Sequence, residues 1–288
     1  MSTSSNHTST VRQPVILTIA GFDPSAGAGI AADLKTFAAH NCYGVAAITS
    51  LTVQNTQSIG HVYPVESHKL KESLDALFED RRISAIKVGM LGDRANAQIV
   101  SEFLAQNGSI PVVIDPILRS GTGTELLDVG GLEVLKESLL RRATVLTPNL
   151  YEAAVLTGSK VENVEEMRAA ARKLVEIGAR AVVVTGGHLE KAVDVYYDGT
   201  VWEAFAGDKV KPENTHGTGC TFSSAITAQL ALGRQLREAV VLAKAYVTEA
   251  IRKAFAVGPG RVPLYHLYRM QQAPRTADHN LAVPEAIH

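Results

Sequence analysis

Short apolar runs alternate with helix-forming segments along most of the chain, and this alternation limits the possible folds more than any other feature. The runs are nearly free of polar residues, as expected for strands that are buried on both faces. Such strands separated by helices are typical of a mainly parallel sheet in a three-layer α/β/α fold. Strands are predicted at 15–20, 44–53, 85–88, 111–114, 143–146 and 181–184, and helices at 28–40, 69–79, 95–106, 132–140 and 164–177.

The rhythm changes in the last third of the chain. Strand-forming residues at 194–205 flank Asp198-Gly199, which predicts a hairpin and therefore an antiparallel edge of the sheet. Two helices should follow, at 218–232 and 236–256. We find no internal repeat and no linker, so we expect a single domain at 14–270 between tails at 1–13 and 271–288.

The charge and the apolar patterning exclude several classes of partner. The net charge is −1 and the chain has no basic block, so we expect no nucleic-acid partner. No apolar run reaches the length of about 18 residues that a membrane helix needs. The first residues lack the order of a secretory signal, and Cys42 and Cys220 are too few for a disulfide framework, which favours the cytoplasm.

Polar residues gather where the predicted strands end. In open α/β sheets, ligands bind beyond the carboxyl ends of the strands. The residues at these ends are Asp23, Gln54-Asn55, Asp115, Asn149 and Thr185. This distribution favours an enzyme over an inert scaffold.

The segment Asn214-Thr-His-Gly-Thr-Gly-Cys-Thr-Phe-Ser224 places a glycine-containing turn before a helix. Thr218 or Thr221 can cap this helix, and Gly217 and Gly219 let the backbone N–H groups turn inward together. A helix start of this kind binds anions, and here it would carry the reactive side chain of Cys220. The pattern alone also fits a helix cap with an incidental thiol.

Two glycine motifs can be rejected. Gly27-Ala-Gly-Ile-Ala-Ala32 has the letters of a dinucleotide fingerprint, but it does not follow its strand directly and no acidic residue lies about 20 residues on. The chain also has no P-loop. Asp33 lies on the apolar side of the helix after these glycines, where it would bind a ligand or tie down a loop amide.

Three polar residues at neighbouring strand ends suggest a metal site. Asn149 and Glu152 could cap a helix, whereas Asp115 and Glu152 together could hold Mg²⁺ beside phosphates. His188 and His216 lack metal-ligand spacing and are predicted to hydrogen-bond within loops.

Taken together, the motifs resemble a known family. The resemblance covers about 15–232 and is to the hydroxymethylpyrimidine/phosphomethylpyrimidine kinases of thiamine biosynthesis, within the ribokinase-like superfamily. The segments that carry it are Ala20-Gly-Phe-Asp-Pro-Ser-Ala-Gly-Ala-Gly-Ile-Ala-Ala-Asp-Leu-Lys-Thr36, Val53-Gln-Asn-Thr56, Lys87-Val-Gly-Met-Leu91, Thr147-Pro-Asn-Leu-Tyr-Glu-Ala153, Gly186-Gly-His188 and Thr215-His-Gly-Thr-Gly-Cys-Thr221.

The resemblance implies a transfer of the γ-phosphoryl group of ATP, with Mg²⁺, to the hydroxymethyl group of 4-amino-5-hydroxymethyl-2-methylpyrimidine and then to its monophosphate. It implies that Gln54 recognises the pyrimidine and that Asn149 and Glu152 organise Mg²⁺ and phosphate, beside the metal site expected from Asp115 and Glu152. The other implied residues are Gly21, Asp23, Ala28, Asp33 and Met90 in the substrate pocket, Asn149, Thr185 and Gly187 at the nucleotide, and Gly217, Thr218, Gly219 and Cys220 as the anion hole.

The chain departs from the family pattern at Thr185, where many members have a lysine, and Arg119 is the candidate for the missing cation. Many related kinases have an aspartate at the position of Cys220. Because helix N-termini lower thiol pKa values, we expect a Cys220 thiolate to act as the base, although the thiol could instead only shape the pocket.

Two other functions stay open from the sequence. A pyridoxine or pyridoxal kinase would use the same fold and phosphate site, but the donor and the acceptor of Gln54 suit an aminopyrimidine better. A non-catalytic pyrimidine-binding protein would not need Asp115, Glu152 and Cys220 together. The sequence does not determine the oligomeric state, so a homodimer also stays open.

Overall fold

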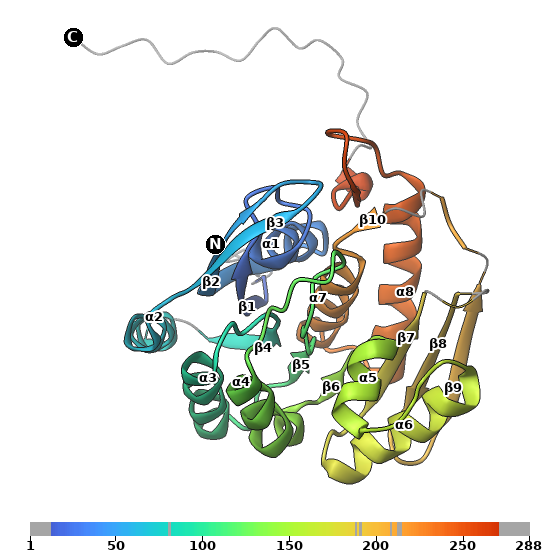
Figure 1. Cartoon of the computed structure of the whole chain (residues 1–288), viewed down its shortest axis with the longest axis horizontal. Helices are drawn as coiled ribbons and strands as arrows, with labels where there is room; N and C mark the ends of the chain where they lie inside the picture. Colours follow the sequence, from blue (N-terminus) through green and yellow to red (C-terminus); the bar gives the residue numbers. More distant parts are fainter. Residues whose placement is uncertain are drawn as a thin grey trace, which may run out of the picture.

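The computed structural model describes residues 13–79, 82–187, 189, 192–207, 209–211 and 215–270. Within these residues, nine strands form one sheet in the order β3-β2-β1-β4-β5-β6-β7-β8-β9 (Figure 1). The central strands all run parallel, which confirms the mainly parallel sheet expected from the sequence. They are β2 (Tyr43–Gln54), β1 (Val15–Phe22), β4 (Ile83–Val88), β5 (Val112–Ile114), β6 (Val145–Leu146) and β7 (Val182–Gly186).

Antiparallel strands lie at both edges of the sheet. β8 (Ala192–Tyr197) and β9 (Trp202–Gly207) form the expected hairpin, whose turn contains Gly199 at a φ of 91°. At the opposite edge, β3 (Ile59–Pro64) pairs with β2 and was not predicted. Its sequence, Ile-Gly-His-Val-Tyr-Pro, has no continuous apolar run because most of its side chains are exposed.

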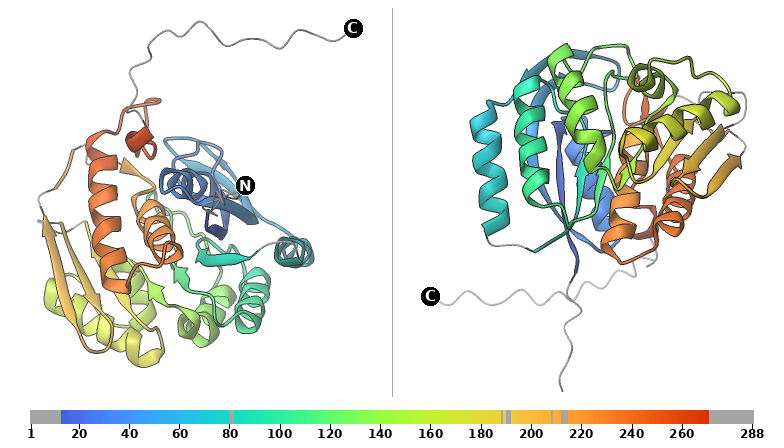
Figure 2. Two further views of the ribbon diagram at one scale, coloured as in Figure 1. Left: turned by 180° about the vertical axis from the view of Figure 1, so that it is seen from behind. Right: turned by 90° about the horizontal axis from the view of Figure 1, so that it is seen from below.

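Helices cover both faces of the sheet, which confirms the three-layer arrangement (Figures 1 and 2). In the right-hand view of Figure 2, α2, α3 and α4 stand side by side across one face. That face carries α2 (Ser67–Glu79), α3 (Arg94–Gln106), α4 (Val129–Val134), α5 (Leu150–Thr157) and α6 (Val164–Ile177), and the other carries α1 (Gly29–Ala39), α7 (Thr218–Ala231) and α8 (Leu236–Arg252).

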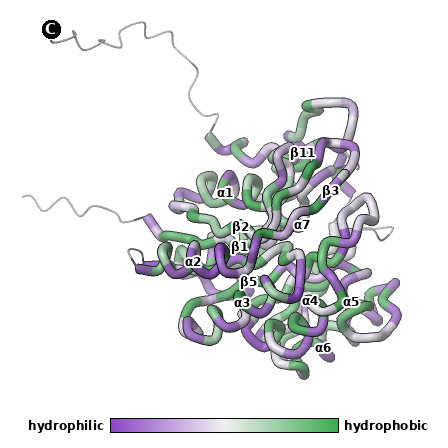
Figure 3. The backbone as a smooth tube through the Cα atoms, turned by 60° about the vertical axis from the view of Figure 1, so that its left-hand side comes forward, coloured by the Kyte–Doolittle hydropathy of each residue, from purple (hydrophilic) through white to green (hydrophobic). Residues whose placement is uncertain are grey.

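The helices differ in how deeply they are buried. α2 is mainly hydrophilic in Figure 3, and only Leu70 and Leu74 are buried. α7 is instead packed between α1 and α8 and against β4 and β5, so most of its side chains are buried, including polar ones. This packing places α7 over the central strands of the sheet, with its first turn at their carboxyl ends.

Three further expectations can be compared with the structure. The helix predicted at 132–140 begins as α4 but continues as a π-helical turn (Leu135–Leu139) and a 3-10 turn (Leu140–Arg142). The tails predicted at 1–13 and 271–288 fall outside the described residues except for Gln13. No helix in the described part of the chain has the length and apolar character needed to cross a membrane.

Candidate functional site

The loop after β1 and the start of α7 meet at the edge of the sheet where the parallel strands end. A short parallel pair, β10 (Thr215–His216) with β11 (Val262–Pro263), leads into this helix. Gly217 has a φ of 83°, and a Cβ atom there would lie 1.8 Å from the carbonyl oxygen of Gly27. Only glycine therefore allows the two loops to approach so closely.

The first turn of α7 has no side-chain cap, so the expected capping by Thr218 or Thr221 is wrong. Gly217 is the N-cap residue. Thr218 Oγ1 instead lies 3.0 Å from Thr215 Oγ1, and Thr221 Oγ1 donates to the carbonyl oxygen of Gly217 at 2.8 Å. Because no side chain occupies this helix start, its N–H groups remain suited to an anionic ligand.

Cys220 lies in this turn, and its side chain is buried. Burial raises the pKa of its thiol to about 12, and the charges of Asp115 and Asp33 add to this effect against the opposing charge of Lys87. The expected lowering of the pKa by the helix N-terminus is therefore wrong, and Cys220 is a thiol at neutral pH.

Lys87 is a component of the site that sequence reasoning did not assign. It is the last residue but one of β4 and has no exposed surface, and its Nζ lies 2.9 Å from Asp33 Oδ2. Burial lowers the pKa of Lys87, but the negative charges of Asp33 and Asp115 outweigh it and the net direction is upward. A lysine within an otherwise apolar strand was the available signal, since such a charge must be paired.

Asp33 was expected to line the substrate pocket, but the structure places it elsewhere. It is completely buried, and Thr18 Oγ1 and Ser224 Oγ each donate to its carboxylate at 2.6 Å. With the ammonium of Lys87, both carboxylate oxygens have internal partners. Asp33 therefore supports the floor of the site, holding α1, β1, β4 and α7 together.

Asp115 and Glu152 are both buried and close enough to influence each other. Burial raises the pKa of Asp115 to about 6, with the charge of Lys87 opposing the rise. Burial also raises the pKa of Glu152 to about 8, and the negative charge of Asp115 contributes to it. Glu152 forms a capping box with the N-cap residue Asn149, with both hydrogen bonds at 2.9 Å, so it supports the start of α5 and also feels the charge of Asp115.

This carboxylate pair fits a magnesium ion that arrives with a nucleotide. Burial raises the pKa values of both carboxyl groups, and a nearby dication would stabilise both in their ionised forms. Mg²⁺ commonly takes one or two carboxylates and completes its coordination with water and phosphate oxygens. The described residues contain no cluster of three or more His, Cys, Asp or Glu side chains that could hold a metal ion.

Asp23 organises the loop between β1 and α1. It accepts hydrogen bonds from the backbone N–H groups of Ser25 (2.8 Å), Ala28 (2.9 Å) and Gly27 (3.2 Å). Burial raises the pKa of Asp23, but hydrogen bonds from His216, Ser25 and Ala28 outweigh it, so the pKa is lowered overall. Asp23 is therefore an ionised acceptor that serves the loop.

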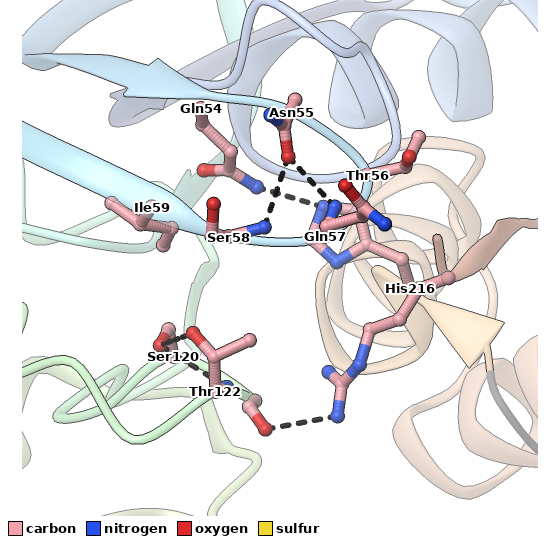
Figure 4. A pocket seen from close by; sticks show the side chains of 11 residues that line it. Gln54, Asn55, Thr56, Gln57, Ser58, Ile59, Ser120, Thr122 and His216 are labelled. Carbon is pink, nitrogen blue, oxygen red and sulfur yellow. Dashed lines mark hydrogen bonds between the residues drawn. The ribbon is translucent and has the colours of Figure 1, made fainter. Parts of the chain in front are cut away.

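His216 hydrogen-bonds within loops, as expected, and it also connects two predicted substrate residues. Its Nε2 lies 3.0 Å from Asp23 Oδ2 and 3.0 Å from Gln54 Nε2. Gln54 and His216 line one pocket, shown in Figure 4. The other lining residues are Asn55, Thr56, Gln57, Ser58, Ile59, Ser120, Gly121, Thr122 and Arg261.

Two predicted substrate residues lie elsewhere at the strand ends. A Cβ atom on Gly21 would come within 2.8 Å of Met90 Sδ, so these residues touch at the ends of β1 and β4. Neither lines the pocket of Figure 4.

The predicted nucleotide residues lie together at the ends of β6 and β7. Asn149 forms a parallel bridge with Thr185, and Gly187 follows with open space where a Cβ atom would be. The guanidinium of Arg119 lies 4.6 Å from the ring centre of Tyr151 and is paired with Glu125 at 2.6 Å. His188 lies outside the described residues.

Comparisons with known proteins show the family to which the chain is similar. A family described as phosphomethylpyrimidine kinase matches residues 23–265. The hydroxymethylpyrimidine/phosphomethylpyrimidine kinase of Aquifex aeolicus is 40% identical over 85% of this chain and 97% of its own length.

Two solved structures have the same fold. The phosphomethylpyrimidine kinase of Clostridium difficile is 38% identical with a TM-score of 0.75, over 83% of this chain and all of that one. The pyridoxal kinase of Bacillus subtilis, solved with ADP, is 36% identical with a TM-score of 0.83, over 90% of this chain and all of that one.

Proposed function

The chain belongs to the phosphomethylpyrimidine kinase family, and from this membership we propose that it phosphorylates the hydroxymethyl group of 4-amino-5-hydroxymethyl-2-methylpyrimidine with ATP. It then phosphorylates the monophosphate, which supplies the pyrimidine diphosphate for thiamine diphosphate synthesis in the cytoplasm. The observation that carries the proposal is the position of the turn before α7. His216 at one end of this turn contacts Gln54, and Gly219 at the other lies beside Asp115.

The turn thus joins a side suited to a heterocycle and a side suited to Mg-ATP. Phosphoryl transfer depends mainly on positioning and charge stabilisation. The hydroxymethyl oxygen forms a bond to the γ-phosphorus while the bond between this phosphorus and the leaving oxygen of ADP breaks. N–H groups of Thr218, Gly219 and Cys220 at the uncapped helix start stabilise the developing negative charge. Mg²⁺ held by Asp115 and Glu152 would neutralise the phosphate oxygens.

The hydroxymethyl proton must also leave, and Cys220 is the proposed acceptor. Its raised pKa means that the resting thiol cannot take a proton as it stands. We therefore propose that the thiol first releases its proton to solvent when the bound reactants change the charge around the turn, and that the resulting thiolate accepts the hydroxymethyl proton. Lys87 contributes a fixed positive charge from below and remains completely buried.

Phosphorylation of pyridoxal is the second candidate activity. It is supported by the likeness to the pyridoxal kinase of Bacillus subtilis over 90% of this chain. The position of Gln54 in the pocket favours the pyrimidine, because its amide offers a donor and an acceptor to an aminopyrimidine edge.

Product analysis tests the proposal. The protein is incubated with Mg-ATP and the hydroxymethylpyrimidine, and ³¹P NMR and mass spectrometry follow the monophosphate and the diphosphate. We expect both esters to appear in sequence with release of ADP. Binding of the pyrimidine by calorimetry without any ester would instead favour the non-catalytic binding protein.

A further inference from the structure

His216 makes two contacts with a single ring nitrogen. The Nε2 atom lies 3.0 Å from Asp23 Oδ2 and 3.0 Å from the terminal amide of Gln54, and Figure 4 shows the latter contact. The side chain of His216 is largely buried, with an exposed fraction of 18%. A buried nitrogen between two polar groups must match both of them in donor and acceptor character.

The carboxylate of Asp23 determines whether His216 Nε2 carries a hydrogen. Oδ2 of Asp23 already accepts from the backbone N–H groups of Gly27 and Ala28, so it is an acceptor toward His216 as well. His216 Nε2 must therefore carry hydrogen and donate it. The one hydrogen on Nε2 points to Asp23 Oδ2 and can only be shared with an acceptor that faces it from Gln54.

The protonated nitrogen in turn fixes the orientation of Gln54. The amide atom drawn 3.0 Å from Nε2 is the Gln54 nitrogen, a second donor, and two donors do not form a hydrogen bond. Rotation of the amide by 180° about its last bond places Oε1 toward His216 and the NH₂ group toward Thr52 Oγ1, now 3.4 Å from the amide. Thr52 can accept there, because its hydroxyl hydrogen is donated to the carbonyl oxygen of Phe22 at 2.9 Å.

We propose that His216 is a positioning residue that orients the Gln54 amide and so makes the site selective for an aminopyrimidine edge. In this orientation, Gln54 has one N–H group and one lone pair of Oε1 left for a ligand, in a fixed order. The inference rests on the proposed function, since it concerns how the same site chooses its heterocycle.

The free groups match the pyrimidine better than pyridoxal. In 4-amino-5-hydroxymethyl-2-methylpyrimidine, a ring nitrogen is next to the carbon that bears the amino group, so an acceptor and a donor lie side by side. The ring nitrogen of pyridoxal is flanked by a methyl-bearing carbon and a C–H group. When the hydroxymethyl groups are superposed, pyridoxal has a formyl oxygen, an acceptor, where the pyrimidine has its amino donor. A fixed Gln54 amide that satisfies both groups of the pyrimidine edge therefore meets an acceptor with its own acceptor in pyridoxal.

A pair of variants separates positioning from general support. His216→Met keeps an unbranched side chain of similar length but removes the donor. His216→Gln places an amide NH₂ group near the original Nε2, from which it can donate to Asp23 and to Gln54 Oε1. His61→Met on the exposed strand β3 is the matched control for loss of a histidine.

The measurements are KM and kcat for the pyrimidine, for pyridoxal and for ATP, together with calorimetric affinity for the pyrimidine without nucleotide. In His216→Met we expect KM and Kd for the pyrimidine to rise about tenfold or more, since tenfold corresponds to about 1.4 kcal/mol. The kcat value at saturation and the KM values for pyridoxal and ATP should change far less. His216→Gln should recover most of the pyrimidine affinity.

Other results would overturn the inference. Equal increases in KM for all substrates would show that His216 only supports the loop held by Asp23. An unchanged KM for the pyrimidine, or no recovery in a folded His216→Gln, would show that it does not orient Gln54. Failure of the proposed function is distinct from these outcomes, because the unmodified protein would then not phosphorylate the pyrimidine at all.

Discussion

The ammonium of Lys87 lies 2.9 Å from the carboxylate of Asp33, and neither side chain has any exposed surface. The pair joins the end of β4 to α1, and Ser224 extends the connection to α7. The pair therefore supports, from inside the protein, the turn before α7 that we assign to the phosphoryl group. Its two charges also act on Cys220 in opposite directions.

Removing one member of this pair should destabilise the protein strongly. Lys87→Met leaves the Asp33 carboxylate buried without its cation, which typically costs about 3–5 kcal/mol. The double variant Lys87→Met/Asp33→Asn removes both charges and should recover a large part of this loss. Urea denaturation of the two variants measures the difference. Equal stability of the single and double variants would mean that the pair is not coupled in this way.

Two glycines of the same turn should respond differently to alanine. Gly217→Ala forces a Cβ atom against the carbonyl oxygen of Gly27 and should disrupt the turn, lowering both stability and activity. A Cβ atom on Gly219 would meet only Asp115 Oδ2, at 3.8 Å, so Gly219→Ala should keep its melting temperature. Its methyl group would enter the phosphate side of the turn and lower kcat. A fully active Gly219→Ala would argue against an anion hole at this position.

The raised pKa of Glu152 predicts how stability depends on pH. Between the ordinary glutamate pKa of 4.5 and about 8, the folded protein holds a proton on Glu152 that the unfolded chain releases. The free energy of unfolding should therefore fall as pH rises through this window. Glu152→Gln keeps the acceptor that caps Asn149 but removes the charge, so it should melt at a higher temperature than the unmodified protein at pH 8 and at a similar one at pH 4.

Although Glu152→Gln should stabilise the protein at pH 8, it should lower the kinase activity. Glu152→Gln should lower kcat and raise the Mg²⁺ concentration needed for half-maximal rate. The matched control is Glu166→Gln, since Glu166 follows the N-cap Asn163 of α6 in the same helix position but away from Asp115. An unaltered Mg²⁺ dependence in Glu152→Gln would leave Glu152 with its capping role alone.

Cys220 should be needed for turnover although it is a thiol in the resting protein. Acid–base assistance typically contributes about 10²–10⁴-fold, so Cys220→Ala should lose about that much in kcat while the pyrimidine still binds. Cys220→Asp should recover a good part, because a carboxylate can accept the same proton. Measurement of kcat between pH 6 and 9 tests this prediction. A nearly normal kcat in Cys220→Ala across that range would mean that another group takes the proton.

Parts of the fold that depend on local pattern could be predicted from the sequence. The continuous apolar runs of β1 and β7 and the strong periodicity of α6 were sufficient, because burial of those faces is encoded within each segment. β3 was missed because an exposed edge strand is stabilised by pairing with a distant segment rather than by its own apolar residues.

The positions of site residues at the strand ends could be predicted from the sequence. Their pKa values and buried partners could not, because these depend on neighbours that are distant in the sequence. Parallel strands must end at one edge, so the gathering of Asp115 and Asn149 there followed from the sequence. The pKa of Cys220 did not, because desolvation and neighbouring charges outweigh the helix terminus only after folding. The partner of Asp33 was missed for the same reason, since Lys87 is 54 residues away.

Selectivity between the two heterocycles tests the central claim most directly. The ratio of kcat/KM for 4-amino-5-hydroxymethyl-2-methylpyrimidine to kcat/KM for pyridoxal is measured at saturating Mg-ATP. The site geometry around Gln54 predicts a ratio well above one, because the pyrimidine presents an amino donor to the amide oxygen where pyridoxal presents a formyl acceptor. A ratio below one, with pyridoxal as the better substrate, would contradict the account.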